Sequence, residues 1–162
     1  MLSHTYKEEL TVKNAQYRTF VRDLFSLILK NDEGKGDITS TIGFSPLDKG
    51  EAVIIAKKGG VIAGLEEMAY FLKAKCKMIT HICDGSVIKK STIIATLRGT
   101  WRSIFLYERL CLNVIGRLSG IATYTRILSD KYPNILITPT RKTFWGQLDK
   151  KACALGGGGT HR

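Results

Sequence analysis

Apolar residues recur at helical spacing in three stretches of the chain. From Tyr17 they occupy positions i, i+3, i+4, i+7, i+8 and i+11, and Asn14 stands where an N-cap is expected. This pattern predicts an amphipathic helix that ends near residues 31–34. Residues 65–74 predict a second, shorter helix. Residues 101–130 keep the same periodicity for longest and predict one long helix, or two helices joined at a serine–glycine pair.

Glycines and charged residues interrupt the longest periodic stretch. Gly116 and Gly120 each cost a helix about 1 kcal/mol relative to alanine, so we expect both to pack closely against another backbone. Glu108, Arg109 and Arg117 lie in the same stretch, and their charges favour a solvent-exposed helix face.

The stretches between the helices are rich in β-branched residues and are separated by turn residues. Five strands are predicted, at residues 51–57, 60–64, 77–83, 87–88 and 92–97. A polar turn is expected at residues 36–40. The order helix, strands, helix and strands predicts an α+β domain of about 100 residues, which is large enough to bury one hydrophobic core.

The C-terminal part of the chain predicts the beginning of a βα repeat. Residues 135–137 have the pattern of a short buried strand, residues 148–155 that of a helix, and a run of glycines ends this helix. Arg141 and Lys142 come just after the predicted strand, at the edge where parallel α/β folds build their ligand sites. One such unit cannot close a barrel.

We therefore expect an α+β N-terminal domain over residues 1–115, followed over residues 116–162 by the first βα unit of an incomplete α/β barrel. The composition, 44% hydrophobic and 24% charged, is ordinary for a folded protein. The N-terminus lacks an apolar signal region, and no apolar run approaches the roughly 20 residues of a membrane helix. We expect a soluble, cytoplasmic protein without membrane contact.

The net charge of +11 indicates an anionic partner. The lysine pairs at residues 57–58, 89–90 and 150–151 stand at the ends of apolar patterns and are interpreted as solvated edges. The four cysteines have no zinc-site spacing and are interpreted as thiols in a reducing compartment. A nucleic-acid partner is disfavoured, because no basic stripe rich in aromatic residues is present.

Cations and flexible backbone gather near the C-terminal end. Arg141, Lys142, His161 and Arg162 lie within 22 residues, with four consecutive glycines among them. Guanidinium groups bind carboxylate or phosphate oxygens two at a time, lysine adds a point charge, and glycines let backbone N–H groups approach an anion. This pattern is typical of an anion site. A frayed basic tail is the alternative that it leaves open.

Six motifs in one order resemble those of a known enzyme family. They occupy residues 36–40, 56–64, 108–113, 118–123, 140–143 and 157–162. From about Tyr17 to the last residue, the chain resembles quinolinate phosphoribosyltransferase, also called carboxylating nicotinate-nucleotide pyrophosphorylase.

The resemblance implies a reaction of NAD biosynthesis. Quinolinate and phosphoribosyl pyrophosphate would give nicotinate mononucleotide, pyrophosphate and carbon dioxide, with Mg²⁺ as cofactor. It also implies a homodimer in which Arg109 is donated by the partner subunit. The other implied substrate-binding residues belong to the same subunit's barrel, with Lys142 as the candidate catalytic residue: Thr140, Arg141, Lys142, His161 and Arg162.

The chemistry of these side chains agrees with the resemblance. Quinolinate carries two adjacent carboxylates, and removing them from water requires several hydrogen-bonding cations at fixed positions. Three arginines, Arg109, Arg141 and Arg162, can supply paired donors. His161 can donate a hydrogen bond or become charged beside the dianion.

The sequence departs from the family pattern after residue 162. The family's further substrate lysine, its ribose and magnesium carboxylates and its phosphate-binding turns follow that point. We therefore expect a fragment that is inactive alone and that self-associates through uncovered apolar surface. One alternative is a non-catalytic shortened paralogue that binds a pyridine dicarboxylate or a full-length subunit. Another is a related family member that acts in molybdenum uptake.

Overall fold

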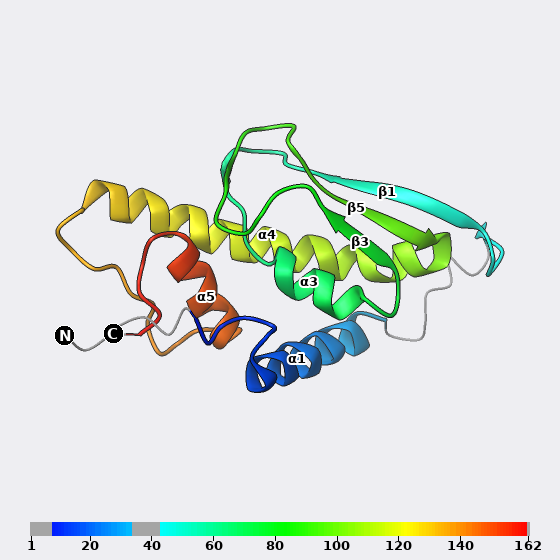
Figure 1. Ribbon diagram of the computed structural model, residues 1–162, viewed down its shortest axis with the longest axis horizontal. Coiled ribbons are helices and arrows are strands. Elements are labelled where there is room, and N and C mark those ends of the chain that lie inside the picture. Colours follow the sequence, from blue (N-terminus) through cyan, green and yellow to red (C-terminus); the bar gives the residue numbers. More distant parts are fainter. Residues whose placement is uncertain (1–7, 34–42, 162) are drawn as a thin grey trace.

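A single long helix, α4 (Trp101–Lys131), runs through the molecule, and the other elements are arranged around it (Figure 1). The computed structural model describes residues 8–33 and 43–161. Thr100 caps α4, because its hydroxyl oxygen accepts a hydrogen bond from the backbone N–H of Ser103 at 3.2 Å. The prediction of one long helix is confirmed, and α4 does not break at its serine–glycine pair.

A three-stranded antiparallel sheet covers one side of α4. Its order is β1 (Lys49–Ile55), β5 (Ile93–Thr100) and β3 (Lys77–Thr80), with β5 in the centre. Ala52 of β1 and Met78 of β3 both lie opposite Leu97, which is buried. Two short strands, β2 (Gly60–Val61) and β4 (Val87–Ile88), pair separately. All five predicted strand positions are confirmed, although β2 and β3 are shorter than predicted and β5 is longer.

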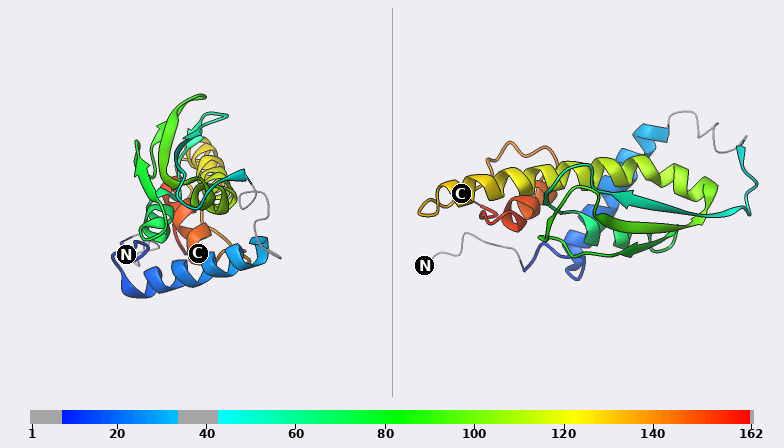
Figure 2. Two further views of the ribbon diagram at one scale, coloured as in Figure 1. Left: turned by 90° about the vertical axis from the view of Figure 1, so that its right-hand side faces the viewer. Right: turned by 90° about the horizontal axis from the view of Figure 1, so that it is seen from above.

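Helices α1 (Ala15–Glu33) and α3 (Leu65–Leu72) complete the N-terminal part. Asn14 is the predicted N-cap of α1, and its Oδ1 accepts hydrogen bonds from the backbone N–H groups of Gln16 and Tyr17 at 2.9 and 3.2 Å. Figure 1 and the left view of Figure 2 show α1 lying across the bottom of the molecule, beneath α3 and α4. Phe25 of α1 meets the ring of Phe71 of α3 edge-on, with centroids 5.5 Å apart.

The C-terminal part differs from its prediction in one respect. The helix is confirmed as α5 (Gln147–Leu155), which packs on α4. The predicted buried strand at residues 135–137 is wrong: this stretch is not a strand, and Ile135 and Leu136 are 61% and 53% exposed. A strand needs hydrogen bonds along its edges. In the described part of the chain, Ile135 bonds to Tyr132 within a local turn, and the one bond to a distant segment is that between Ile137 and Gly159. The proposed domain boundary at residue 115 lies inside α4 and stays a prediction.

Two further predictions concern a turn near the end of α1 and membrane-spanning helices. The polar turn at residues 36–40 lies outside the described residues. Among the helices that the structure describes, none is long and apolar enough to cross a membrane.

Candidate functional site

The backbone segment that precedes α5 and the segment that follows it contact each other. The N–H of Gly159 donates a hydrogen bond to the carbonyl oxygen of Ile137 at 2.8 Å. Gly158 makes this approach possible, because a Cβ atom there would lie 2.7 Å from the same carbonyl oxygen and 2.7 Å from the sulfur of Cys153. By chain reach alone, Thr140 then lies within about 10 Å of Ile137 and His161 within about 7 Å of Gly159. The contact therefore brings together the backbone from which the two basic segments continue.

The predicted site residues that lie on these segments face solvent. Thr140, Arg141 and Lys142 are exposed, and the hydroxyl oxygen of Thr140 accepts a hydrogen bond from the backbone N–H of Lys142 at 3.0 Å. This bond folds the three residues into a local turn. His161 is also exposed, and Arg162 lies outside the described residues.

Arg109 is not brought to this turn within one chain. It lies on α4 with a 71% exposed side chain, and its Nη1 is 3.8 Å from Oδ1 of Asp32. Arg126 binds the carbonyl oxygen of Gly156 at 3.1 Å, 17 residues further along α4. Those 17 residues correspond to about 25 Å of helix.

An ion pair between α4 and α5 holds Trp145, which follows the turn at residues 140–142. Arg117 donates to the two carboxylate oxygens of Asp149 at 3.2 and 2.9 Å, and the backbone N–H of Trp145 donates to Oδ2 of Asp149 at 3.1 Å. The guanidinium carbon of Arg117 lies 5.1 Å from the ring centroid of Trp145. The predicted exposed helix face is therefore confirmed for Glu108, Arg109 and Arg117. The Arg117 side chain, which is 37% exposed, is also paired with Asp149.

A buried charge cluster lies beneath α5, and the sequence interpretation missed it. Lys151 is 8% exposed and donates to carboxylate oxygens of Glu66 and Glu67, whereas the sequence pattern predicted a solvated edge there. Glu67 is fully buried and also accepts a hydrogen bond from the hydroxyl of Tyr17 at 2.7 Å. The signal available in the sequence was the position of Lys151, three residues after Leu148 on the inner face of a helix.

In this cluster, the paired charges affect the pKa values of Lys151 and Glu66 more than burial does. Burial alone would lower the pKa of Lys151, but the negative charge of Glu67 and hydrogen bonds to both glutamates raise the pKa above its ordinary value. Burial would likewise raise the pKa of Glu66, but hydrogen bonds from Lys151 and Thr11 lower it. The cluster thus ties α5 to α3 and α1, and both pKa shifts favour the charged forms of Lys151 and Glu66 at neutral pH.

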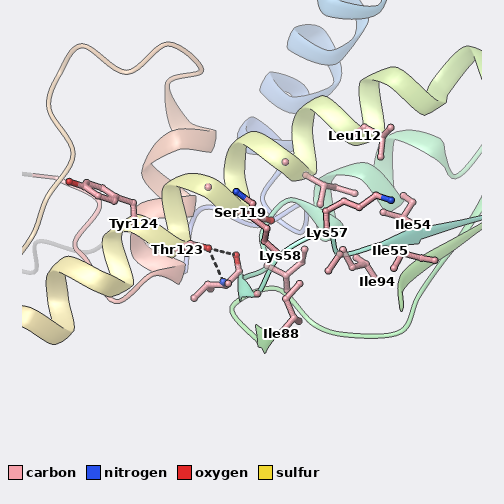
Figure 3. A pocket seen from close by; sticks show the side chains of 18 of the residues that line it. Ile54, Ile55, Lys57, Lys58, Ile88, Ile94, Leu112, Ser119, Thr123 and Tyr124 are labelled. Carbon is pink, nitrogen blue, oxygen red and sulfur yellow. Dashed lines mark hydrogen bonds between the residues drawn. The ribbon is translucent and has the colours of Figure 1, made fainter. Parts of the chain in front are cut away.

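An apolar groove of about 580 Å³ lies between β1, the loop that follows it and α4 (Figure 3). Figure 3 shows Lys57 and Lys58 at this groove, with Leu112 on the α4 side. Gly116 and Gly120 line it, and a Cβ atom at either would meet nothing within 4 Å. The prediction that these glycines pack against another backbone is therefore wrong for the described residues of this chain.

The described residues do not fit a magnesium site. Within residues 8–33 and 43–161, no three His, Cys, Asp or Glu side chains gather in a group that could hold a metal ion.

Comparisons with known proteins agree on one family. The model of the family "Quinolinate phosphoribosyl transferase, N-terminal domain" matches residues 37–119, which is half of the chain. Quinolinate phosphoribosyltransferase [decarboxylating] 1 of Nicotiana glauca is 35% identical over 96% of this chain and 46% of its own length. A probable nicotinate-nucleotide pyrophosphorylase [carboxylating] of Bacillus subtilis is 38% identical over 88% of this chain and 51% of its own length.

Solved structures show the same likeness. NadC from Streptococcus pyogenes matches with a TM-score of 0.79 and 26% identity, over 88% of this chain and 54% of that one. The nicotinate-nucleotide pyrophosphorylase from Ehrlichia chaffeensis matches with a TM-score of 0.76 and 31% identity, over 85% and 53%. The chain thus spans about half the length of the relatives that it matches. It belongs to the quinolinate phosphoribosyltransferase family.

Proposed function

We propose that this chain supplies dicarboxylate-binding residues to a quinolinate phosphoribosyltransferase of NAD biosynthesis. In that reaction, quinolinate and phosphoribosyl pyrophosphate give nicotinate mononucleotide, pyrophosphate and carbon dioxide. The names of its relatives support this reaction class. The observation that carries the proposal is the hydrogen bond between Gly159 and Ile137, because it makes neighbours of the two segments that bear the cations.

Each cation has a distinct task in binding a doubly negative pyridine. Arg141 binds one carboxylate through two parallel hydrogen bonds, and Lys142, the proposed catalytic residue, adds a mobile point charge. His161, from the neighbouring segment, donates a hydrogen bond to the second carboxylate, and Arg162 and Thr140 complete the proposed set. When carbon dioxide leaves, the ribosylated pyridinium ring holds the electron pair until that carbon is protonated, so the residues need only place the ring and balance its charge. Mg²⁺ stays a prediction from the family, as does the cytoplasmic location.

Helix α4 offers one face to a second copy of the chain, which is the proposed partner. Five residues share this face at positions i, i+3, i+7, i+11 and i+18: Arg109, Leu112, Gly116, Gly120 and Ile127. The last four line the apolar groove, and its two open glycines let another backbone approach closely. A copy seated in the groove would meet Arg109 on the same face. This continuity supports a homodimer in which Arg109 is donated across the interface.

Calorimetry of the purified chain tests the dicarboxylate site. We expect quinolinate to bind at least about tenfold more tightly than nicotinate, which has one carboxylate, because one charge-assisted pair is worth about 1.5–3 kcal/mol. Arg141→Gln removes that advantage. Arg22→Gln, which removes an exposed arginine of α1, is the matched control and leaves binding unchanged. Absence of quinolinate binding, or equal binding by Arg141→Gln, would overturn the proposal.

Product formation is measured on the same samples. That the chain alone is inactive stays a prediction, and formation of nicotinate mononucleotide by the purified chain would contradict it. A chain that binds quinolinate but does not restore product to a full-length relative carrying an inactivating substitution in this segment would fit the non-catalytic alternative instead. A chain that restores product to a full-length relative carrying an inactivating substitution in this segment would support the enzyme.

A further inference from the structure

The turn that carries Arg141 and Lys142 is held at both of its ends. At its beginning, Ile137 is fixed by the hydrogen bond from Gly159. At its end, the backbone N–H of Trp145 is fixed by Asp149, and Trp145 packs against the hydrophobic core. Seven residues separate the two anchors, and the hydrogen bond from Lys142 to Thr140 within them is local. Phe144, the last of the seven, also lies near the Arg117 guanidinium. The position of the turn therefore depends on how firmly Trp145 is held.

Asp149 is the centre of the second anchor. Its side chain is 6% exposed and accepts three hydrogen bonds, two of them from Arg117. A buried carboxylate needs such partners, because an unpaired one would lose several kcal/mol of solvation. Asp149 also lies in the first turn of α5, where the helix dipole favours a negative charge. Helix α5 has no side-chain N-cap, since Gly146 occupies that position.

Arg117 connects this anchor to the long helix. Its guanidinium lies 5.1 Å from the ring centroid of Trp145 and 5.5 Å from that of Phe144, so it contacts the end of the turn as well as Asp149. The guanidinium of Arg117 donates from two nitrogens to one carboxylate, which fixes the orientation of the carboxylate as well as its distance. A lysine at the same position could not fix the orientation.

We propose that Arg117 and Asp149 are positioning residues, whose ion pair anchors the end of the turn and so sets where Arg141 and Lys142 present their charge to a dicarboxylate. Neither residue touches the substrate. The inference rests on the proposed function for its consequence in binding, but the anchoring itself is a property of the free chain.

Limited proteolysis measures the anchoring without any ligand. Trypsin cleaves after Arg141 and after Lys142, and an anchored turn resists it because the protease binds extended chain. We expect Asp149→Asn, which keeps the shape and removes the charge, to raise the cleavage rate at these two bonds at least about tenfold. Arg117→Lys keeps the charge but loses the paired donors, so an intermediate rise is expected, and it serves where Asp149→Asn fails to fold.

The matched control is a variant that destabilises α5 but leaves the Arg117–Asp149 ion pair intact. Ala152→Gly weakens the same helix by about 1 kcal/mol, and Ala152 lies on α5 in the core. We expect it to leave cleavage at Arg141 and Lys142 within about twofold of the unaltered chain. Equal acceleration in Ala152→Gly and Asp149→Asn, or no acceleration in Asp149→Asn and Arg117→Lys, would overturn the inference.

Quinolinate calorimetry on the same variants completes the test. A displaced turn should cost about 10- to 100-fold in affinity in Asp149→Asn, with Ala152→Gly unchanged. If the unaltered chain does not bind quinolinate, the proposed function fails while the cleavage rates still decide the anchoring. If cleavage rises but affinity stays the same, the anchoring holds and its role in binding is refuted.

Discussion

The backbone N–H of Gly159 lies 2.8 Å from the carbonyl oxygen of Ile137, and this contact joins the backbone that leads into the two basic segments of the chain. One segment precedes α5 in the sequence and the other follows it. The contact thus gives a structural basis for grouping Arg141, Lys142 and His161.

Replacing Gly158 tests how closely the two segments must approach. The added methyl group of Gly158→Ala would lie 2.7 Å from the Ile137 carbonyl oxygen and 2.9 Å from Cγ2 of Thr125. We expect a loss of about 1–3 kcal/mol in the free energy of unfolding in urea, with quinolinate affinity reduced as well. An unchanged unfolding midpoint would show that the segments are less tightly packed than the contact indicates.

Gly120→Ala has the opposite expected effect on stability. Its methyl group meets nothing within 4 Å, so the helix should gain about 1 kcal/mol relative to glycine. Sedimentation should nevertheless show weaker self-association, because the methyl group narrows the groove proposed for a second copy. Lys90→Ala, on an exposed loop outside the groove, is the control. Unaltered self-association of Gly120→Ala would exclude this face of α4 as the dimer interface.

The buried cluster around Lys151 predicts how stability depends on pH. The raised pKa of Lys151 means that its contribution is complete below its ordinary value of 10.5 and is lost as pH rises through the folded-state value. The raised pKa of Tyr17 acts in the same direction. The lowered pKa of Glu66 means that its contribution is present above 4.5 and is lost as pH falls through the folded-state value.

Lys151→Met should cost about 3–5 kcal/mol at neutral pH, because it leaves buried carboxylates unpaired. In this variant, the free energy of unfolding should also fall less steeply as pH rises above neutral. The part of the decline that remains should come from Tyr17. Lys150→Met is the matched control on the same helix. Urea titrations between neutral pH and pH 11 measure both effects, and parallel curves for Lys151→Met and the unaltered chain would contradict the prediction.

Local features of the fold could be predicted from the sequence, and contacts between distant segments could not. The cap at Asn14 and the length of α4 depend on neighbouring residues, and both were predicted correctly. Lys151 was misplaced because a lysine is rarely buried without partners, and its partners lie 84 and 85 residues away. The pairing of Arg117 with Asp149 escaped prediction for the same reason.

The glycines of α4 show a further limit of sequence reasoning. Gly116 and Gly120 do not pack against the described part of this chain, and the open space beside them lies in the apolar groove. A pattern of small residues predicts close approach without identifying the partner. Likewise, the apolar character of residues 135–137 predicted burial, but the described part of the chain leaves Ile135 and Leu136 exposed.

A titration of the isotope-labelled chain with quinolinate, followed by the backbone amide resonances, tests the central claim most directly. If the cations of the two segments hold one dicarboxylate, the amides of Lys142, Gly159 and His161 shift together with a single dissociation constant, and Arg141→Gln abolishes all three shifts. If quinolinate moves none of these amides, or moves one segment and leaves the other unchanged, the two segments do not form a common site.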